Sequence, residues 1–596
     1  MYIESKNRHP WAHALTLCML IAVATSCVQK EFPVTESIRF NQLGFYPSEE
    51  KVAVIFSDTV GNLPFSIRNM ANRKIVYTGV SSELRSSSFS DKKTSVLSFS
   101  DVTAPGQYRI EVPAVGQSHQ FTIGENILQD VSLAGLKAFY YQRASTPVEE
   151  VYAGQWNRPS GHPDDRVMVH SSAVSPNRPE GTVISSPKGW YDAGDYNKYI
   201  VNSGFTVGVL LSLYEDFPDE VKQQDGNIPE SGNATPDLLD EIHWNIDWML
   251  TMQDPADGGV YHKLTEPEFE GFIKPTDCQK QRYVVAKSVT ATLDFAASMA
   301  QASRVYAGYG ADYPGVAEKT LSAARDAFNW ALKNPDILYR QRDMNEKFDP
   351  DITTGEYGDR AAGDEFFWAA VELYVTTREA GFLKTAMAYA PETYRLPTWG
   401  RVSGLGAWTL LRYAGSLEDE SGKELAGKMQ SQLLAYADSA AQNVESAPYY
   451  APYGREAGDF FWGCNSDAAS NQGITFLYAW MLTKDRKYLT DALRDMDYIL
   501  GRNATGFCYI TGQGYKSPMN PHHRLSASDE LVDPLPGFMV GGPNPGKQDG
   551  CEYPSDIPDE CYADVTPSYA SNEIAINWQG LFTYFSTALN ASLQKE

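Results

Sequence analysis

Residues 190–217 read WYDAGDYNKYIVNSGFTVGVLLSLYEDF, and this stretch contains both a change of fold class and a first candidate for chemistry. From Tyr199 onward, apolar residues recur three and four positions apart, which is the pattern of a helix packed in a core. Before it, Asp192 and Asp195 stand around an Ala-Gly pair and among aromatic residues. A solvated turn explains Asp beside Gly. It does not explain the aromatic rings, so the two carboxyl groups call for a functional interpretation as well.

The helical pattern continues along the chain from about residue 125. Long loops rich in Gly and Pro separate the helices, and such loops in a compact domain usually carry function. We therefore expect an all-α domain over residues 125–596, in which helical hairpins close into a ring. The expected helices lie at 127–142, 199–217, 235–253, 288–306, 363–377 and 571–590, with weaker patterns at 318–332, 428–442 and 471–484.

The preceding segment has a different period. Short apolar or alternating runs are separated by turn residues, which is typical of an immunoglobulin-like β-sandwich. We expect this domain over residues 37–124 and assign it a structural role, because it carries no cluster of catalytic side chains. The expected strands are 51–56, 65–70, 74–79, 94–99, 107–112 and 119–124.

The N-terminus has the pattern of an export signal. Lys6 and Arg8 precede an apolar run at 14–24, which is too short for a permanent membrane span. The sequence ATSC follows and ends at Cys27, so residues 1–27 are predicted to be a lipoprotein signal peptide whose cleavage leaves a lipidated Cys27. An ordinary signal peptide cleaved near the same point is the alternative. Either interpretation predicts an exported protein.

The composition narrows the class of partner. The chain is 42% hydrophobic and 12% aromatic, so it can build an ample core and still supply rings for stacking on sugars. Its net charge of -25 argues against a nucleic-acid partner and favours a neutral substrate. Cys551 and Cys561 could pair across a loop, or could be isolated thiols. No cysteine framework for a metal is visible.

Two carboxylates, Asp195 and Glu573, are expected near the N-termini of helices. Asp195 precedes the helix that begins near Tyr199, where the helix dipole favours an ionised carboxylate suited to a general base. A simple N-cap is the commonest reason for Asp at such a position, and on spacing alone it is favoured. Glu573 is expected in the first turn of the last helix, capped by Ser571 or Asn572. It would act as a general acid only if burial, or a carboxylate such as Asp564, raised its pKa.

A third candidate element is the loop GYKSPMNPHHRLSASD. His522, His523 and Arg524 are hydrogen-bond donors in a proline-braced loop, which suits recognition of hydroxyl or carboxylate groups. Adjacent histidines could also hold a metal. However, no i, i+4 spacing supports zinc.

The segments WYDAGDYNKY, KSPMNPHHR and YADVTPSYASNEIAIN occur in this order along the helical domain. This ordered set resembles glycoside hydrolase family nine, whose members are inverting glycosidases and mostly endo-β-1,4-glucanases. The segment IRFNQLGFYPSEEKVAVI is similar to the immunoglobulin-like module of that family. The resemblance covers nearly all of the mature chain. It implies a multidomain protein with an N-terminal immunoglobulin-like β-sandwich followed by an all-α (α/α)6 barrel.

The resemblance also implies roles for residues of the matching motifs. Asp195 would be the base that activates water, Asp192 would help to hold that water, and Glu573 would be the acid that protonates the departing oxygen. Inversion needs a water between base and sugar, so the two carboxyl groups should stand roughly 6.5–9.5 Å apart.

Other residues would bind or orient the substrate. His522 and Arg524 would contact the sugar beside the scissile bond, and Asp564 would orient the site. Aromatic residues in loops are candidate platforms for sugar rings, with core packing as the alternative for each. They are Trp190, Tyr191, Trp399 and Trp462.

The resemblance bears on metals as well. Some relatives with the immunoglobulin-like domain hold a structural zinc through two Cys and two His, but Ala144 and Gly161 stand at the cysteine positions here, so we predict no zinc. Calcium often binds at a D-E pair that opens a helix, which resembles Asp364 and Glu365 with Asp359 nearby. A solvated acidic helix start is the alternative. No cofactor is required for the chemistry.

The predicted function is thus an inverting endo-β-1,4-glucanase acting on cellulose, mixed-linkage glucan or xyloglucan. Two alternatives remain: an exo-acting glucosidase or glucosaminidase of the same family, and a glycan-binding lipoprotein without catalysis. We expect a monomer that meets the membrane only through its lipid anchor, in the outer membrane, facing the periplasm or the cell surface.

Overall fold

The computed structural model describes residues 32–56 and 61–594, so the predicted signal peptide and Cys27 lie outside the described residues. The first domain is a sandwich of two antiparallel sheets. One sheet has the order β1 (Ile38–Arg39), β2 (Val52–Phe56), β6 (Lys93–Ser98), β5 (Arg85–Ser86). The other has the order β4 (Ile75–Val80), β3 (Pro64–Asn69), β7 (Gly106–Val112), β8 (Gly116–Gln117), and β9 (Phe121–Ile123) pairs with β7.

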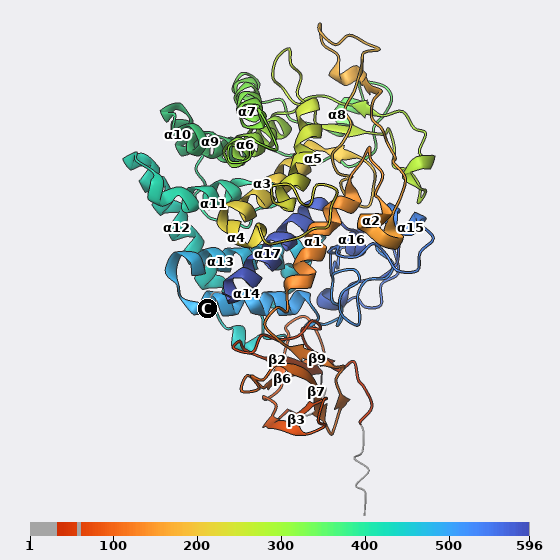
Figure 1. The fold of residues 1–596 in the computed structure, drawn as a ribbon, viewed down its shortest axis with the longest axis vertical. Coiled ribbons are helices and arrows are strands. Elements are labelled where there is room, and N and C mark those ends of the chain that lie inside the picture. Colours follow the sequence, from red (N-terminus) through yellow and green to blue (C-terminus); the bar gives the residue numbers. More distant parts are fainter. Residues whose placement is uncertain (1–31, 57–60, 595–596) are drawn as a thin grey trace, which may run out of the picture.

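The sandwich packs against one side of the helical domain (Figure 1). Polar contacts join the two: the Tyr46 hydroxyl donates to Asn590 Oδ1 at 2.8 Å, and Asn41 Nδ2 donates to Asp497 Oδ1 at 2.8 Å. Both hydrogen bonds are buried. A buried donor or acceptor that lost its partner would cost about 1–3 kcal/mol of stability. The sandwich is therefore a fixed part of the molecule and not a loosely tethered module.

The second domain is a barrel of helical hairpins, which confirms the predicted order of fold classes. Each inner helix packs against an outer partner, and the ring closes where the last inner helix meets the first. The inner helices are buried on nearly every side, as expected of helices surrounded by protein. They are α3 (Ile200–Asp216), α6 (Val289–Tyr306), α9 (Gly363–Thr377), α11 (Ser403–Tyr413), α13 (Asn471–Thr483) and α17 (Ile576–Gln594).

The outer helices are more amphipathic, because one face of each meets solvent. They are α5 (Asp237–Thr251), α7 (Val316–Lys333), α10 (Ala380–Ala388), α12 (Glu420–Ala440), α14 (Arg486–Ile499) and α1 (Gln129–Gln142). Short helices occur in the loops: α2 (Glu150–Ala153), α4 (Pro218–Val221), α8 (Gln341–Asn345), α15 (Arg524–Ser528) and α16 (Tyr569–Asn572).

A small sheet within the helical domain was not predicted. Its order is β11 (Val183–Ile184), β10 (Val167–Val169), β14 (Tyr283–Val284), β13 (Lys263–Thr265), β12 (Lys198–Tyr199). The strands have two or three residues each, too few for an alternating pattern to be recognised in the sequence. Since α3 begins directly after β12, the sheet fixes the loop that carries Asp192 and Asp195.

Two smaller findings concern membrane spans and cysteines. Among the residues that the structure describes, no helix is long and apolar enough to cross a membrane. Cys551 and Cys561 are free thiols, which decides between the two alternatives left open for them.

Candidate active site

Main-chain pairing brings the three motifs together. Ala193 forms an antiparallel bridge with Ala575, and His522 forms a parallel bridge with Glu573. Gly194 lies where these segments cross: a Cβ atom on it would stand 2.2 Å from the carbonyl oxygen of His522. Only glycine fits this crossing, which explains the Ala-Gly pair between the two aspartates.

The pairing closes one side of a cleft of about 740 Å³. Both predicted catalytic carboxyl groups, Asp195 and Glu573, line it. Other residues predicted from the sequence line it too: Asp192, His522, Arg524, Trp399 and Trp462. The lining also contains residues that the sequence did not single out: Phe269, Tyr357, Asp467, Tyr569 and Asn577.

Asp195 is not a helix cap. The N-cap of α3 is Tyr199, which makes no side-chain capping bond, and Asp195 stands five residues before the helix. Its Oδ2 accepts from Asn197 Nδ2 at 2.5 Å and from the Tyr199 hydroxyl at 3.0 Å. Among the described residues, the hydrogen bonds to this carboxylate reach Oδ2, so Oδ1 is available for a water in the cleft.

Asp192 is held just as firmly. Its Oδ1 accepts from Asn202 Nδ2 at 2.7 Å, and its Oδ2 accepts from the Tyr357 hydroxyl at 2.6 Å. Burial, followed by the charge of Asp195, raises the pKa of Asp192 to about 8. The Asp192 carboxyl group therefore favours its protonated form more strongly than an exposed aspartate does.

Glu573 lies between two helices and not in the first turn of the last one, which corrects the prediction. α16 ends at Asn572, α17 begins at Ile576, and Glu573 itself is extended and pairs with His522. The shape of this junction follows from tertiary pairing, which a local capping pattern cannot reveal. Burial, then the charge of Asp195, raises the pKa of Glu573 well above its ordinary value. A carboxyl group that stays protonated near neutral pH is what a general acid requires.

His522 presents a defined face to the cleft. Its Nδ1 lies 2.8 Å from the carbonyl oxygen of Thr566, which can only accept, so this nitrogen carries the proton. Burial lowers the pKa of His522 to about 4, so the ring is neutral at neutral pH. Its Nε2 is then an acceptor for a hydroxyl group of a sugar.

Arg524 ties the catalytic loop to a second loop. Its Nη1 donates to the Gly194 carbonyl oxygen at 2.7 Å, and its Nε donates to the Glu270 carbonyl oxygen at 2.9 Å. Its positive charge also lowers the pKa of Glu573, against the larger effects of burial and Asp195. Arg524 thus acts on both the geometry and the electrostatics of the site.

Asp564 lies outside the cleft lining and holds two loops in place. It accepts from the backbone N–H groups of Met519 at 2.9 Å and Asn520 at 2.8 Å, and from Asn572 Nδ2 at 3.1 Å. Met519 and Asn520 stand three and two residues before His522, and Asn572 stands directly before Glu573. The geometry therefore suits an orienting role.

The four candidate aromatic platforms divide into two pairs. Trp190 and Tyr191 are fully buried, so the prediction that they stack on sugars is wrong and their alternative, core packing, is correct. Trp190 Nε1 donates to Glu241 at 2.8 Å inside the core. Trp399 and Trp462 line the cleft, and Trp462 is 39% exposed.

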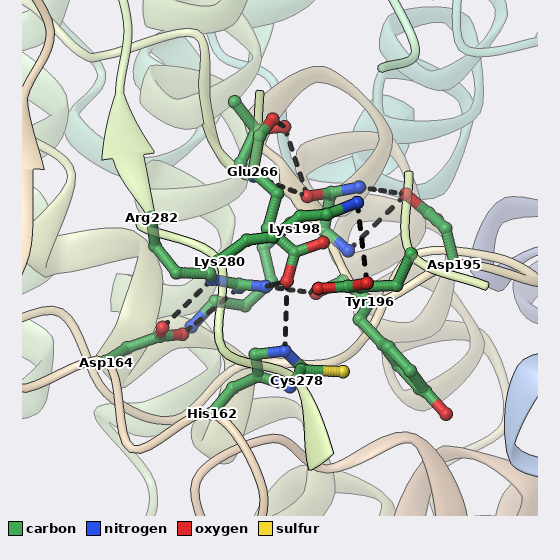
Figure 2. Close-up of polar contacts among 12 residues, drawn as sticks. His162, Asp164, Asp195, Tyr196, Lys198, Glu266, Cys278, Lys280 and Arg282 are labelled. Atoms are coloured by element: carbon green, nitrogen blue, oxygen red, sulfur yellow. Dashed lines mark hydrogen bonds and ion pairs between the residues drawn. The ribbon is translucent and has the colours of Figure 1, made fainter. Parts of the chain in front are cut away.

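A buried polar network lies beneath the catalytic loop (Figure 2). Asn197, which donates to Asp195, accepts from the backbone N–H of Glu266 at 2.9 Å. Next to it, Asp164 pairs with Lys198 at 2.8 Å and with Arg282 at 3.0 Å. Burial alone would raise the pKa of Asp164, but the two cations hold it below its ordinary value. These interactions fix the segment that follows Asp195 in the chain.

The same network contains a group with metal-ligating side chains. One ligand atom each of His162, Glu266 and Cys278 lies within 4.8 Å of the others. However, the two nitrogens of His162 already contact the Tyr191 hydroxyl at 2.8 Å and Glu266 at 3.2 Å. Gly161, at one of the expected cysteine positions, faces Pro275, whose Cβ would stand 2.4 Å from an added Cβ. The four-ligand zinc set of some relatives does not fit these residues.

The predicted calcium residues have a buried neighbour that the sequence did not indicate. Asp294 and Glu365 are both fully buried, and none of their carboxylate oxygens has a hydrogen-bond partner among the described residues. Burial, followed by the charges of Asp364 and Asp359, raises the pKa of Asp294 well above its ordinary value. Buried carboxylate oxygens without protein donors are the type of ligand that a hard cation such as calcium binds.

Two further cleft residues have no local sequence pattern that marks them as site residues. Tyr357 has a left-handed backbone (φ 44°) that aims its hydroxyl at Asp192. Asp467 lies in a π-helical turn, Asn465–Ser470, and its Oδ1 has no partner among the described residues. Burial raises the pKa of Asp467 to about 7. Strain and π-helical turns are frequent at functional sites.

Comparisons with known proteins agree with this geometry. The family model for glycosyl hydrolase family 9 matches residues 129–586, and the model for the cellulase N-terminal immunoglobulin-like domain matches residues 34–117. A xyloglucan-specific endo-β-1,4-glucanase of Bacteroides ovatus is 52% identical over 96% of this chain and 97% of its own. Endoglucanase D of Acetivibrio thermocellus is 32% identical over 94% of this chain and 84% of its own.

Solved structures give the same result. A family 9 glycoside hydrolase of Bacteroides ovatus, 52% identical, superposes with a TM-score of 0.90 over 94% of this chain and 99% of its own. A thermostable endoglucanase of Alicyclobacillus acidocaldarius, 29% identical, has a TM-score of 0.82 over 93% of this chain and 100% of its own. The protein is a glycoside hydrolase, and its chain belongs to glycosyl hydrolase family 9.

Proposed function

We propose that this enzyme is an inverting endo-β-1,4-glucanase that cleaves xyloglucan, with Asp195 as the general base and Glu573 as the general acid. One observation carries the proposal: a carboxyl group with a strongly raised pKa lines the same cleft as a second, firmly oriented carboxylate. The choice of xyloglucan rests on the Bacteroides ovatus relative, which is similar over nearly its whole length.

The residues of the cleft divide the reaction between them. Asp195 takes a proton from water as the water oxygen attacks the anomeric carbon, and Glu573 gives its proton to the departing glycosidic oxygen. Asp192, fixed by Tyr357 and Asn202, orients that water beside Asp195. His522 accepts a hydrogen bond from a sugar hydroxyl, and Asp564 keeps the loops before His522 and Glu573 in place.

The aromatic residues of the cleft bind the glucan chain. Trp399, Trp462 and Tyr569 line the cleft and offer flat apolar faces to the C–H faces of glucose rings. The ring centroids of Trp462 and Tyr569 lie 5.3 Å apart, so the two rings form adjoining parts of one apolar surface.

A calcium ion held by Asp294, Asp359, Asp364 and Glu365 is a second part of the proposal. Its support is the pair of buried carboxylates of Asp294 and Glu365, whose oxygens have no hydrogen-bond partner among the described residues. When bound, the ion supplies charge compensation for helix α9 at Asp364 and Glu365; it takes no part in bond cleavage. We propose no zinc and no further cofactor.

Export as a lipoprotein anchored through Cys27 and action as a monomer also belong to the proposal, and their support is the sequence alone. Labelling with a radioactive fatty acid tests the anchor: the Cys27→Ser variant should lose the label. Retention of the label by that variant would rule out the anchor.

The decisive assay for the function is turnover by the purified enzyme on xyloglucan, mixed-linkage glucan and cellulose, followed by viscosity and by product size. We expect a rapid fall in viscosity and oligosaccharides of several sizes, because an endo-acting enzyme cuts within chains. Release of a single small sugar from chain ends would instead support the exo-acting alternative. Binding without any release of reducing ends would support the glycan-binding alternative.

A further inference from the structure

Three large apolar side chains stand exposed beside the cleft. Phe269, Phe272 and Ile273 are 43%, 40% and 37% exposed, and all three belong to the loop between β13 and β14. We call them the phenylalanine rim. Water-exposed apolar side chains that cluster in one place mark a binding surface, so the rim is a candidate ligand-binding site.

The rim is fixed to the catalytic loops. The Arg524 guanidinium lies 5.5 Å from the Phe269 ring centroid and 5.4 Å from that of Phe272. The Phe272 and His522 rings pack edge to face, with their centroids 5.2 Å apart. The Tyr196 hydroxyl donates to the Ile273 carbonyl oxygen at 2.8 Å. A surface held by so many contacts is preorganised for a ligand and loses little entropy on binding.

Most of the phenylalanine rim lies outside the lining of the cleft. Among the described residues that line the cleft, Phe269 is the only member of the rim. Trp399, Trp462 and Phe269 line the cleft, whereas Phe272 and Ile273 do not. A sugar branch that leaves a chain bound in the cleft would meet Phe272 and Ile273 beside it.

The local charge narrows the kind of branch. Glu268 and Glu270 flank Phe269, and Lys280 pairs with both, at 3.3 Å and 3.4 Å. The carboxylates thus meet a cation of the protein itself, and the protein carries a net charge of -25. The net negative charge of the whole protein disfavours an acidic branch, whereas a neutral branch can pack on the apolar rings.

We propose that the phenylalanine rim binds a neutral pentose branch of the glucan, such as the xylosyl groups of xyloglucan. This inference rests on the proposed function and deepens it. A pentose in pyranose form lacks an exocyclic hydroxymethyl group, so its C–H faces can lie against Phe272 and Ile273. We expect each such contact to contribute a modest binding free energy, comparable to that of an aromatic pair.

The test compares two neutral substrates, xyloglucan and mixed-linkage β-glucan, in the full-length mature enzyme. For the Phe272→Ala and Ile273→Ala variants we expect kcat/KM on xyloglucan to fall about tenfold, mainly through a higher KM. The fall on mixed-linkage glucan should be at least fivefold smaller. Phe272→Leu should recover most of the loss, since it keeps an apolar surface. Phe348→Ala, at an exposed phenylalanine outside the cleft lining, is the matched control and should change neither substrate.

The outcomes separate this inference from the proposed function. If the wild-type enzyme cleaves linear glucan but not xyloglucan, the proposed substrate is wrong, and the rim proposal falls with it. If the wild-type enzyme cleaves xyloglucan but both variants lose the two activities equally, the rim only positions His522, and the branch site is refuted. Unchanged kinetics in both variants would also refute it. Should Phe272→Ala unfold, the Ile273→Ala variant decides alone.

Discussion

Ala193 and Ala575 pair through their backbones in an antiparallel bridge, and this pairing sets the acid and the base of the enzyme on one cleft. Asp195 stands two residues beyond one partner and Glu573 two residues before the other. A second bond, from the Ile576 N–H to the Asp192 carbonyl oxygen at 2.8 Å, closes the same junction. Side chains from opposite ends of the catalytic domain thus share one site because the ring of helices closes.

The division of labour between the two carboxyl groups predicts different responses to the leaving group. Glu573→Gln should lower turnover of a natural glucan by about a thousandfold or more, since general acid catalysis and the pKa match are both lost. It should lower turnover of a dinitrophenyl cellooligosaccharide far less, because that leaving group departs without a proton. Asp195→Asn should impair both substrates. Equal losses on both substrates for Glu573→Gln would contradict its role as the acid.

Tyr357 should matter for rate and not for binding. Tyr357→Phe removes the 2.6 Å hydrogen bond to Asp192 and leaves the ring in contact with Trp399. We expect kcat to fall about tenfold with little change in KM, because the water loses its orientation. Tyr339→Phe, at a buried tyrosine outside the cleft lining, is the control. A variant with full kcat would show that Asp192 needs no such support.

Two tryptophans provide a matched pair of variants. Trp462→Ala should raise KM about tenfold with a small effect on the melting temperature, because the ring is exposed in the cleft. Trp190→Ala should lower the stability by roughly 3–5 kcal/mol, as expected for a buried aromatic ring in a core. Kinetics and thermal unfolding of both variants check the pair. A reversal of the two effects would mean that the platform has been misplaced.

The buried Asp467 should make the stability of the folded protein depend on pH. Its raised pKa, about 7 against an ordinary 3.8, means that the folded state binds a proton that the unfolded state releases between these pH values. The stability contributed by this group is therefore present below about pH 4 and is lost as the pH rises through about 7. Asp467→Asn should be more stable than the wild type at pH 8, on the order of 1–4 kcal/mol, and the gain should shrink toward pH 4.

Denaturant titrations at several pH values measure this gain. Asp254→Asn is the control of opposite sign: burial alone would raise the pKa of Asp254, but Lys287 holds it below its ordinary value. This variant should lose more stability at high pH than at low pH. A gain for Asp467→Asn that does not depend on pH would disprove the account of Asp467.

The calcium site predicts an effect of chelation on stability. EDTA should lower the melting temperature of the wild type, and added calcium should restore it, because an ion that binds only the folded state stabilises it. The response should vanish in Asp294→Asn. It should persist in Asp495→Asn, which changes another fully buried aspartate far along the chain in α14. A wild-type enzyme indifferent to EDTA, with no calcium found by elemental analysis, would exclude the site.

Sequence reasoning reached those parts of the site that lie in contiguous motifs. Asp192, Asp195, His522, Arg524 and Glu573 were predicted, because each motif keeps its spacing along the chain. The class of fold was predicted as well, since residue periods of two and 3.6 differ plainly over long segments.

The remainder depends on tertiary contacts. Trp190 looked like a cleft residue because its neighbours in the sequence are catalytic, yet its side chain turns into the core toward Glu241. Tyr357, Asp467 and Asp294 reach their sites from separate loops and helices, and no local pattern marks them. The position of Glu573 outside the last helix is set by pairing with His522, which also lies beyond local reach.

The central claim is that a water held by Asp195 attacks the sugar on the face opposite to the oxygen protonated by Glu573. Proton NMR of the first sugars released from a β-1,4-glucan, recorded before mutarotation, tests it most directly. The account predicts that the new reducing end appears as the α-anomer. A β-anomer as the first product would mean that configuration is retained, and the proposed roles of both residues would then be wrong.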